Sequence, residues 1–538
     1  MQFKKFSLST LFLLVFQMVL FAQETAERGL DERINEAFTP ISDGWQSIVF
    51  FNVPFLGVPF VLVLLVGGAL FFTLYFGFIN IRGFGKAIQT VRGTYDDIER
   101  AEGTRLKPQV NVVDGDLVDT IKDESKEGEV SHFQALATAV SGTVGLGNIA
   151  GVALAIALGG PGATFWMIVC GLLGMSTKFV ECTLGVKYRD VGPDGTVYGG
   201  PMYYLSKGLR SKGYDGLGKA LGVVFAILCV GASFGGGNAA QSNQAASQLA
   251  SLIGWTSGSA GTIIGIVLAV VVGFVIIGGI KRIASVTEKV VPFMAVIYVL
   301  ACLYVIIANF SYVDDAFGLI FSQAFSPQAG LGGLAGVLLT GFRRAAFSNE
   351  AGAGSAAIAH SAVKTNFAAS EGLVALLEPF IDTVVICTMT ALVIIMFNST
   401  GVFEYGSGTS TGVLINGEEI EGAVLTSMAF ENAISWFPYV LTVAIVLFAV
   451  STMISWSYYG AQAWMYLFGK SKRMDMTYKV IFCLFIVIGA AADMSSVWGF
   501  SDAMILALVF PNMFGLFFLV KDVRFELDRY LKAIRRSN

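Results

Sequence analysis

Two glycine-rich interruptions of otherwise apolar segments hold the residues best suited to binding chemistry. The first reads Ser-Gly-Thr-Val-Gly-Leu-Gly-Asn over residues 141–148, and the second reads Ser-Asn-Glu-Ala-Gly-Ala-Gly over residues 348–354. Each glycine costs a helix about 1 kcal/mol relative to alanine, so both clusters predict helices that open near their midpoints. Unwound backbone is tolerated at membrane depth only where it faces protein or lines a cavity.

The peptide groups freed at such openings suit a zwitterion and a hard cation. Free N–H groups at the start of a half-helix attract a carboxylate, and freed carbonyls coordinate an ammonium group or sodium. Both solutes could then be neutralised without a fixed buried charge. Close packing of small residues between helices is the alternative reason for each glycine cluster. Two clusters at comparable places, five spans apart, favour the binding interpretation.

Other kinds of chemistry have little support in the sequence. The only two histidines, His132 and His360, lie far apart without ligand-like spacing, and no GxxxxGK[ST] run is present. No basic run indicates a nucleic-acid partner, and no cofactor is expected. The cysteines stand singly in apolar segments, as packing thiols do: Cys170, Cys182, Cys229, Cys302, Cys387 and Cys483. The sequence therefore does not predict an enzyme.

The elements that must position the two openings are membrane helices. Of the 538 residues, 55% are hydrophobic and 14% are charged, and the mean hydropathy is +0.69. Stretches long enough to span a bilayer recur about eleven times, near residues 56–80, 133–158, 161–186, 217–238, 259–280, 286–308, 331–358, 372–397, 436–468, 478–492 and 498–520. The runs are too long and too unalternated for a β-barrel, so an all-α polytopic membrane protein is predicted.

The charges of the connecting loops predict how these helices are oriented. Lys and Arg recur in alternate loops, within residues 82–126, 187–212, 281–289, 470–479 and 521–536. The loops 309–330 and 398–421 contain acidic residues but no Lys or Arg. Because cytoplasmic loops are enriched in Lys and Arg, the basic loops and the C-terminus are predicted to face the cytoplasm. A multi-pass protein of the inner (plasma) membrane is expected.

The predicted domain boundaries follow from these spans. Residues 1–22 have the pattern of a signal peptide, with an uncleaved signal anchor as the alternative. Residues 23–54 are then a periplasmic segment, residues 55–520 a transmembrane domain and residues 521–538 a cytoplasmic tail.

The spans also predict an internal repeat. If the first span is peripheral, the other ten divide into residues 133–308 and residues 331–520, each set led by an interrupted helix. An odd number of spans per repeat inverts the second set relative to the first. This architecture is associated with alternating access.

Several segments resemble the alanine or glycine:cation symporter family. They are SGTVGLGNIAGVA (141–153), GGPGATFWM (159–167), FGGGNAAQ (234–241), GFRRAAFSNEAGAGSAAIAH (341–360) and FIDTVVICT (380–388), of which the fourth is highly specific. The likeness covers essentially residues 55–520, and the first opening also looks like the unwound core helix of LeuT-type sodium-coupled transporters. The resemblance implies sodium-coupled symport of alanine or glycine by a lipid-embedded monomer, with one peripheral helix and a five-plus-five inverted repeat. Proton coupling is the nearest alternative, and a channel or solute sensor is less well supported.

The resemblance also implies contacts with the substrate. These are Thr143, Gly145 and Gly147 for the carboxylate, and Phe347, Ser348 and Asn349 for the amine. Asn148 would serve the substrate or a second ion. Trp456 would form a wall of the pocket, with plain packing as its alternative.

By the same resemblance, sodium should bind beside the first opening. Its implied ligands are the carbonyls of Ser141 and Val144 and the hydroxyls of Ser451 and Thr452. For the two hydroxyls, a hydrogen bond to the carbonyl one turn back in the same helix is the alternative role.

Two amides share a face of the span near 217–238. Asn238 and Gln241 are spaced to project together, so they could face a central cavity as substrate or gating contacts. Hydrogen bonding to a neighbouring helix is the alternative.

Ionisable side chains inside the spans are interpreted first as structural or gating groups. Glu378 and Asp382 lie one helical turn apart and are the candidates for binding a proton or a cation. Lys178 and Glu181 have the i,i+3 spacing of an ion pair. The charges that flank the second opening are candidates for a gate: Arg343, Arg344 and Glu350.

Overall fold

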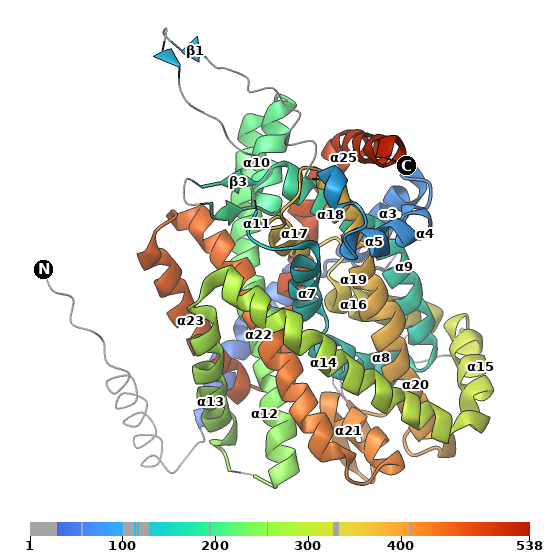
Figure 1. Ribbon diagram of the computed structural model, residues 1–538. Helices are drawn as coiled ribbons and strands as arrows, with labels where there is room; N and C mark the ends of the chain where they lie inside the picture. Colours follow the sequence, from blue (N-terminus) through green and yellow to red (C-terminus); the bar gives the residue numbers. More distant parts are fainter. Residues whose placement is uncertain are drawn as a thin grey trace, which may run out of the picture.

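The computed structural model describes residues 30–54, 57–99, 112–113, 116–117, 128–192, 195–255, 257–326, 333–408 and 412–537. The predicted signal segment 1–22 lies outside these residues. Within them, seven helices are long and apolar enough to cross a membrane, and a bent pair adds an eighth. The chain is an all-α polytopic membrane protein, as predicted (Figure 1). Helix occupies each of the eleven predicted ranges, while the number of spans stays a prediction.

Both predicted openings interrupt a helix. In the first, α7 (His132–Thr143) is followed by the short turn η2 (Leu146–Asn148) and α8 (Ala150–Gly159), with a bend of 55° between the halves. In the second, α16 (Gly333–Asn349) gives way to six residues of irregular backbone, 350–355, before α17 (Ala356–His360). These breaks confirm the two broken helices expected from the glycine clusters.

The first break leads one set of helices. They are α9 (Gly162–Lys187), α10 (Pro201–Ser211), α11 (Asp215–Phe234), η3 (Gly235–Ala239), α12 (Ala240–Ile253), α13 (Ala260–Ile276) and α14 (Gly279–Ala308). The π-helical turn η3 joins α11 and α12 into one long helix, so this span extends well beyond the predicted end at residue 238.

The second break leads the other set. It contains α18 (Ala368–Ala375), α19 (Leu377–Pro379), the π-helical η5 (Phe380–Cys387), α20 (Thr388–Phe397), η6 (Asn398–Thr400), α21 (Gly422–Ala433), α22 (Phe437–Phe468), α23 (Lys472–Ala491), α24 (Met494–Ala507) and α25 (Val509–Ser537). The predicted tail 521–538 continues α25 as helix.

The remaining elements lie around these two sets. They are α2 (Leu30–Val49), α3 (Phe60–Tyr75), α4 (Ile79–Arg82), α5 (Phe84–Val91), η4 (Phe310–Tyr312), α15 (Val313–Ala324) and the paired strands β1 (Val112–Val113) with β2 (Asp116–Leu117), β3 (Asp190–Val191) with β4 (Val197–Tyr198), and β5 (Gly412–Ile415) with β6 (Glu418–Glu421). Helix α2 packs against α24, where the Ser42 hydroxyl donates to the Ser496 carbonyl at 2.8 Å.

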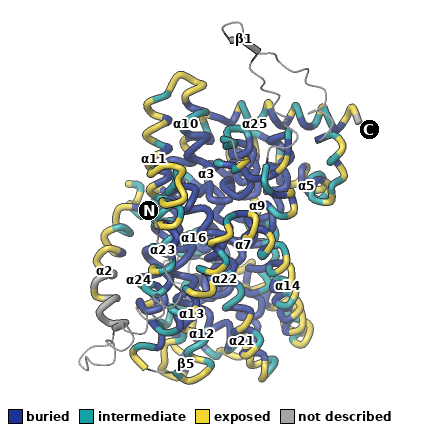
Figure 2. The backbone as a smooth tube through the Cα atoms, turned by 60° about the vertical axis from the view of Figure 1, so that its left-hand side comes forward, coloured by how far each residue is buried: buried dark blue, intermediate teal, exposed yellow. Residues whose placement is uncertain are grey.

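Burial separates a packed interior from a lipid-facing rim (Figure 2). The middle of α22 is buried on all sides, because α7, α11 and α12 surround it. By contrast, α13 and α14 expose large apolar side chains, among them Val270, Phe274, Leu300 and Ile307. Such a surface suits hydrocarbon rather than water, as expected for helices at the edge of a membrane protein.

The two ends of the molecule carry different loops. Helices α5, α10 and α25, which belong to basic segments, lie toward the upper end in Figure 1, whereas α15 and α21, which border the acidic loops, lie toward the lower end. This arrangement agrees with the alternation of loop charge in the sequence.

Candidate functional site

The first break brings backbone close to α12 and α22. Gly145 is extended (φ −144°, ψ −145°), and a Cβ there would lie 2.4 Å from Thr452 Oγ1. Its amide donates to Asn148 Oδ1 at 2.8 Å, and the next amide, that of Leu146, donates to Gln241 Oε1 at 3.1 Å. Two freed amides at the predicted carboxylate site are therefore satisfied by side-chain oxygens in this closed form.

The second break turns through left-handed backbone. Glu350 has φ +55°, and Gly352 and Gly354 have φ +97° and +83°, a region that glycine enters without steric cost. The turn is held by side chains: Asn349 Oδ1 accepts from the Ala351 amide at 3.0 Å. The glycines here thus supply a conformation rather than only close packing.

The two breaks meet at a carboxylate. A Cβ on Gly147 would lie 3.3 Å from Ser348 Cα, so the backbones nearly touch. Asp382 of η5 spans the junction: Oδ1 accepts from Asn148 Nδ2 at 2.6 Å, and Oδ2 accepts from Ser348 Oγ at 2.8 Å and Thr383 Oγ1 at 2.7 Å. The Asp382 side chain therefore accepts hydrogen bonds from both broken helices.

The Asp382 carboxylate is fully buried and lacks a cationic partner. Among the described residues, no Lys, Arg or His forms an ion pair with it. Burying an ionised carboxylate costs several kcal/mol unless a counter-charge or a proton neutralises it. Asp382 therefore places an ionisable carboxylate at the junction of the breaks, and binding of both solutes by main-chain groups alone stays a prediction.

Three of the four residues implied for sodium lie in direct contact. Thr452 Oγ1 donates to the Ser141 carbonyl at 3.0 Å, and Ser141 Oγ donates to the Ser451 carbonyl at 2.8 Å. Ser451 Oγ instead donates to Phe448 within its own helix at 3.0 Å, which is the alternative role for that hydroxyl. Val144 follows the last turn of α7 as its C-cap.

The other predicted contacts divide between the breaks and the scaffold. Gln241 reaches the first break, as described, and the indole of Trp456 donates to Glu350 Oε1 of the second break at 3.0 Å. Asn238 turns away: its Nδ2 donates to the Phe482 carbonyl of α23 at 2.7 Å. This is the helix-to-helix bond considered as its alternative, and it arises because the π-helical turn η3 redirects the side chain.

Two of the expected ionic arrangements differ in the structure. Lys178 does not pair with Glu181 but with Glu378, at 3.0 Å, and both side chains are fully buried. Glu181 instead accepts from the Gly352 amide at 2.9 Å and from Asn512 Nδ2 at 2.8 Å. Contacts between different helices determine these ion-pair partners. The i,i+3 spacing in the sequence predicts partners only within one helix.

The arginines before the second break pair with α24 rather than with Glu350. Arg343 Nε lies 2.8 Å from Asp502 Oδ2, and Arg344 contacts the same oxygen. The Phe347 and Trp498 rings pack at 4.9 Å beside them. The gate cluster, so called after the role predicted for its arginines, comprises Arg343, Arg344, Asp502, Phe347 and Trp498. It lies where α16 meets α24, the helix that packs against α2.

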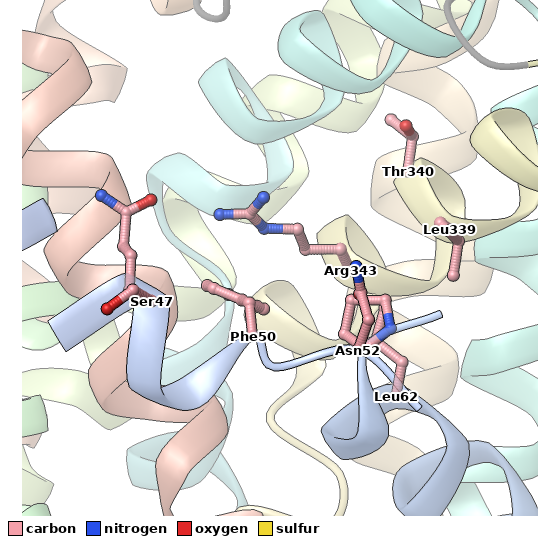
Figure 3. Close-up of a pocket in the computed structure, with 9 residues that line it drawn as sticks. Ser47, Phe50, Asn52, Leu62, Leu339, Thr340 and Arg343 are labelled. Carbon is pink, nitrogen blue, oxygen red and sulfur yellow. The ribbon is translucent and has the colours of Figure 1, made fainter. Parts of the chain in front are cut away.

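A pocket of about 480 Å³ lies outside this gate cluster. It is lined by residues from α2, from the connection to α3 and from α16, and Arg343 extends its guanidinium into it toward Phe50, 4.3 Å from the ring centre (Figure 3). The pocket therefore ends at the gate cluster, and the breaks beyond it are buried.

The comparison with known families decides the classification. A model described as the sodium:alanine symporter family matches residues 104–538. The chain belongs to this family. The resemblance to alanine or glycine:cation symporters is thereby confirmed, and the protein is a membrane transporter rather than an enzyme.

Individual relatives in the family are similar over nearly their full length. The sodium/alanine symporter AgcS of Methanococcus maripaludis is 41% identical over 463 residues, which are 86% of this chain and 92% of the relative. The probable sodium/glutamine symporter GlnT of Bacillus subtilis is 31% identical over 474 residues, 88% of this chain and 87% of the relative. The solved structure of MhsT in complex with L-phenylalanine has a TM-score of 0.48 at 15% identity, over 73% of this chain and 89% of that one.

Proposed function

We propose that the protein is a sodium-coupled symporter that carries alanine or glycine into the cell. The observation that carries the proposal is the meeting of two broken helices around the buried Asp382. Membership in the sodium:alanine symporter family and the similarity to the sodium/alanine symporter AgcS support sodium as the ion and alanine as the solute.

In this proposal, Asp382 is the counter-charge for the substrate ammonium group. The carboxylate lies beside Ser348, at the second break, where the amine was expected from the resemblance. The substrate carboxylate then replaces the side-chain oxygens of Asn148 and Gln241 on the amides of the first break. Sodium binds next to it, at the Ser141 and Val144 carbonyls and the Thr452 hydroxyl.

The closed form described by the structure suits a transporter more than a channel. Asn148, Ser348 and Asp382 are all buried, and the gate cluster separates them from the outer pocket. Transport then requires one side of the breaks to open while the other stays closed. Residues between the breaks and each end supply the two gates.

Only small amino acids should compete for uptake. Large side chains crowd the breaks: Trp456, Phe347 and Gln241 are buried there, and a Cβ on Gly237 would lie 2.2 Å from the Trp456 ring. Uptake of labelled alanine is measured with an inward sodium gradient. A high excess of unlabelled alanine or glycine should abolish this uptake, whereas leucine and phenylalanine should not. Competition by unlabelled glutamine tests whether this protein also accepts glutamine, the solute in the name of the GlnT relative. Strong competition by leucine would contradict the small pocket.

Ligand and ion can be identified together by thermal stabilisation of the purified protein. Ligands that bind only the folded state raise the apparent melting temperature, by an amount that reports their affinity. Alanine and sodium should each strengthen the effect of the other, because coupling between two binding sites is reciprocal. Sodium replaced by potassium is the control. Equal stabilisation by alanine in both salts would contradict sodium coupling.

Replacing Thr452 by alanine should weaken the response to sodium selectively. The variant loses one proposed sodium ligand, the hydroxyl beside the Ser141 carbonyl. A polar contact to a charged group contributes about 1.5 kcal/mol, which corresponds to about a tenfold loss of sodium affinity. Thr442→Ala on the same helix is the control, because its hydroxyl donates to the Pro438 carbonyl, away from the breaks. The sodium dependence of alanine stabilisation measures both. An unchanged sodium dependence in Thr452→Ala removes that residue from the site.

Proton coupling remains the second candidate, favoured by one observation. Glu378 is already paired with Lys178, so Asp382 is the carboxylate left for a transported proton. A proton on Asp382 would satisfy its burial as a cation does. Proton coupling would be supported if an uncoupler abolishes alanine uptake while a sodium gradient persists. Sodium coupling would be supported if uptake needs sodium but no pH gradient.

The membrane setting completes the proposal. The protein resides in the inner (plasma) membrane as a monomer, with the basic loops and α25 on the cytoplasmic side. The loop charges support this orientation. A reporter enzyme fused after residue 538 that is active only in the cytoplasm tests the side of the C-terminus.

A further inference from the structure

A chain of buried acids and bases lies between the breaks and the end of the molecule that carries α5 and α25. Glu371 of α18 binds a histidine through each carboxylate oxygen: Oε2 contacts His132 Nδ1, and Oε1 lies 2.5 Å from His360 Nδ1. The chain continues from His132 Nε2 to Glu99 Oε2 at 3.0 Å and from His360 Nε2 to Glu378 Oε2 at 3.7 Å. All five side chains are buried. None of them belongs to the predicted substrate or sodium site.

The geometry at His132 specifies its protonation state. Each of its two ring nitrogens faces a carboxylate oxygen, one of Glu371 and one of Glu99. An ionised carboxylate only accepts hydrogen bonds, so both ring nitrogens must carry hydrogen to make these contacts. With both carboxylates ionised, the arrangement requires His132 to be an imidazolium cation.

The charges of the buried acids and bases in this cluster agree with a protonated His132. Its three carboxylates supply three negative charges, and Lys178, at 3.0 Å from Glu378, supplies one positive charge. Two imidazolium groups bring the sum of these six groups to zero; the buried Glu181 and Glu350, which also act on Lys178, lie outside this count. With both histidines neutral, two negative charges would remain buried, which costs several kcal/mol.

The surroundings of the chain add mainly hydrogen-bond donors. Thr365 Oγ1 donates to Glu99 Oε2 at 2.7 Å, and the Tyr530 hydroxyl of α25 donates to Glu99 Oε1 at 3.3 Å. Other charged groups also lie around these elements. Arg189 donates to the Ser361 carbonyl at 2.8 Å, and Arg529 lies 4.9 Å from the centre of the Phe367 ring. Glu288 of α14 accepts from Gln134 of α7 at 2.9 Å, and Glu181 and Glu350 act on Lys178. No further cation meets His132 among the described residues.

The cluster joins the half of the first broken helix that precedes its break to the half of the second that follows its break. His132 is the first residue of α7, and His360 is the last residue of α17. Next to them the backbones also pair: the Glu129 amide donates to the Ala362 carbonyl at 2.8 Å, and the Lys364 amide donates to the Val130 carbonyl at 2.9 Å. Opening this end must separate α7 from α17, and thus His132 from Glu371.

We propose that Glu99, His132, Glu371 and His360 form a proton-binding latch that keeps the cytoplasmic side closed. The proposal rests on the proposed alternating-access function. When the latch opens, water replaces the carboxylates around His132, and its Nε2 proton passes to that water; closing takes a proton back from the same side. Because the closed form binds more protons, raising the cytoplasmic pH favours opening.

The protonation state can be tested without any transport measurement. The chain contains only two histidines, so 15N-histidine labelling of the untagged protein gives signals from this latch alone, and His360→Gln assigns the remainder to His132. Both ring nitrogens of His132 should be protonated at about pH 7.5, where a free histidine is mostly neutral. A neutral His132 at that pH would overturn the proposal. In the wild-type spectrum both histidines should be doubly protonated, and this result needs no variant. His360→Gln is needed only to assign a neutral signal to one of them.

The link to opening is tested by sodium-driven alanine uptake at several luminal pH values. One linked proton changes the closed-to-open ratio by at most about tenfold per pH unit. Wild-type uptake should rise with luminal pH, and His132→Gln, which keeps a neutral donor, should give fast uptake with a flat profile. Glu526→Gln is the control, since this carboxylate pairs with Lys187 outside the latch and should leave the wild-type profile intact.

The two proposals fail in different ways. If alanine uptake never requires sodium, the proposed function is wrong, while the histidine signals still decide the proton site. If uptake requires sodium but His132→Gln keeps the wild-type pH profile, the latch is wrong and the symporter stands.

Discussion

Replacing Asp382 by asparagine is expected to abolish sodium-driven alanine uptake. Asparagine keeps the size of the side chain, and its one carbonyl oxygen can still accept from Asn148 or from Ser348. It removes the carboxylate charge that contacts both broken helices. Removing one partner of a buried charge pair costs about 3 kcal/mol or more, so alanine affinity should fall by about 100-fold or more. Uptake into proteoliposomes and thermal stabilisation by alanine measure the two effects.

The comparison needs a control for folding and for charge. Asp215→Asn removes an exposed carboxylate at the start of α11, which pairs with Lys219 at 2.8 Å, and it should transport like the wild type. Unfolding temperatures without ligand should be similar in both variants. If Asp382→Asn still takes up alanine with wild-type affinity, Asp382 is not the counter-charge and the site must be sought elsewhere along the breaks.

Replacing Lys178 by methionine should destabilise the protein strongly. The change leaves Glu378 fully buried, with only His360 at 3.7 Å as an ionic neighbour. Breaking a buried ion pair by removing one partner typically costs about 3–5 kcal/mol. A lower melting temperature of the purified variant, measured without ligand, is the expected result.

A second change separates loss of the pair from loss of packing. The double variant Lys178→Met with Glu378→Leu removes both charges and should recover most of the lost stability, because an apolar pair of similar volume is often neutral or better. Lys212→Met breaks a half-exposed pair with Asp522 at 3.0 Å and should cost at most about 1 kcal/mol. Equal destabilisation by Lys178→Met and Lys212→Met would show that the buried ion pair contributes no more to stability than the half-exposed one.

Local sequence properties were sufficient for the fold class and for the two breaks. Apolar stretches of about 20 residues define membrane helices regardless of their neighbours. Glycine at 145, 147, 352 and 354 weakens a helix through its own backbone, so the breaks follow from composition at those positions. The resemblance in residues 341–360 then indicated the family, because that segment is specific.

Only the tertiary structure decided which side chains meet at the breaks. Asp382 lies over 200 residues from Asn148 and in a π-helical turn, whose changed helical register directs it to the breaks and Glu378 to Lys178. The same holds for Asp502 with Arg343 and for Glu371 between two histidines. Spacing along one helix predicts only partners on that helix, whereas a buried charge takes whichever partner the packing of other helices brings within reach. The sequence by itself therefore determined where the backbone opens, and the packing decided what charge stands there.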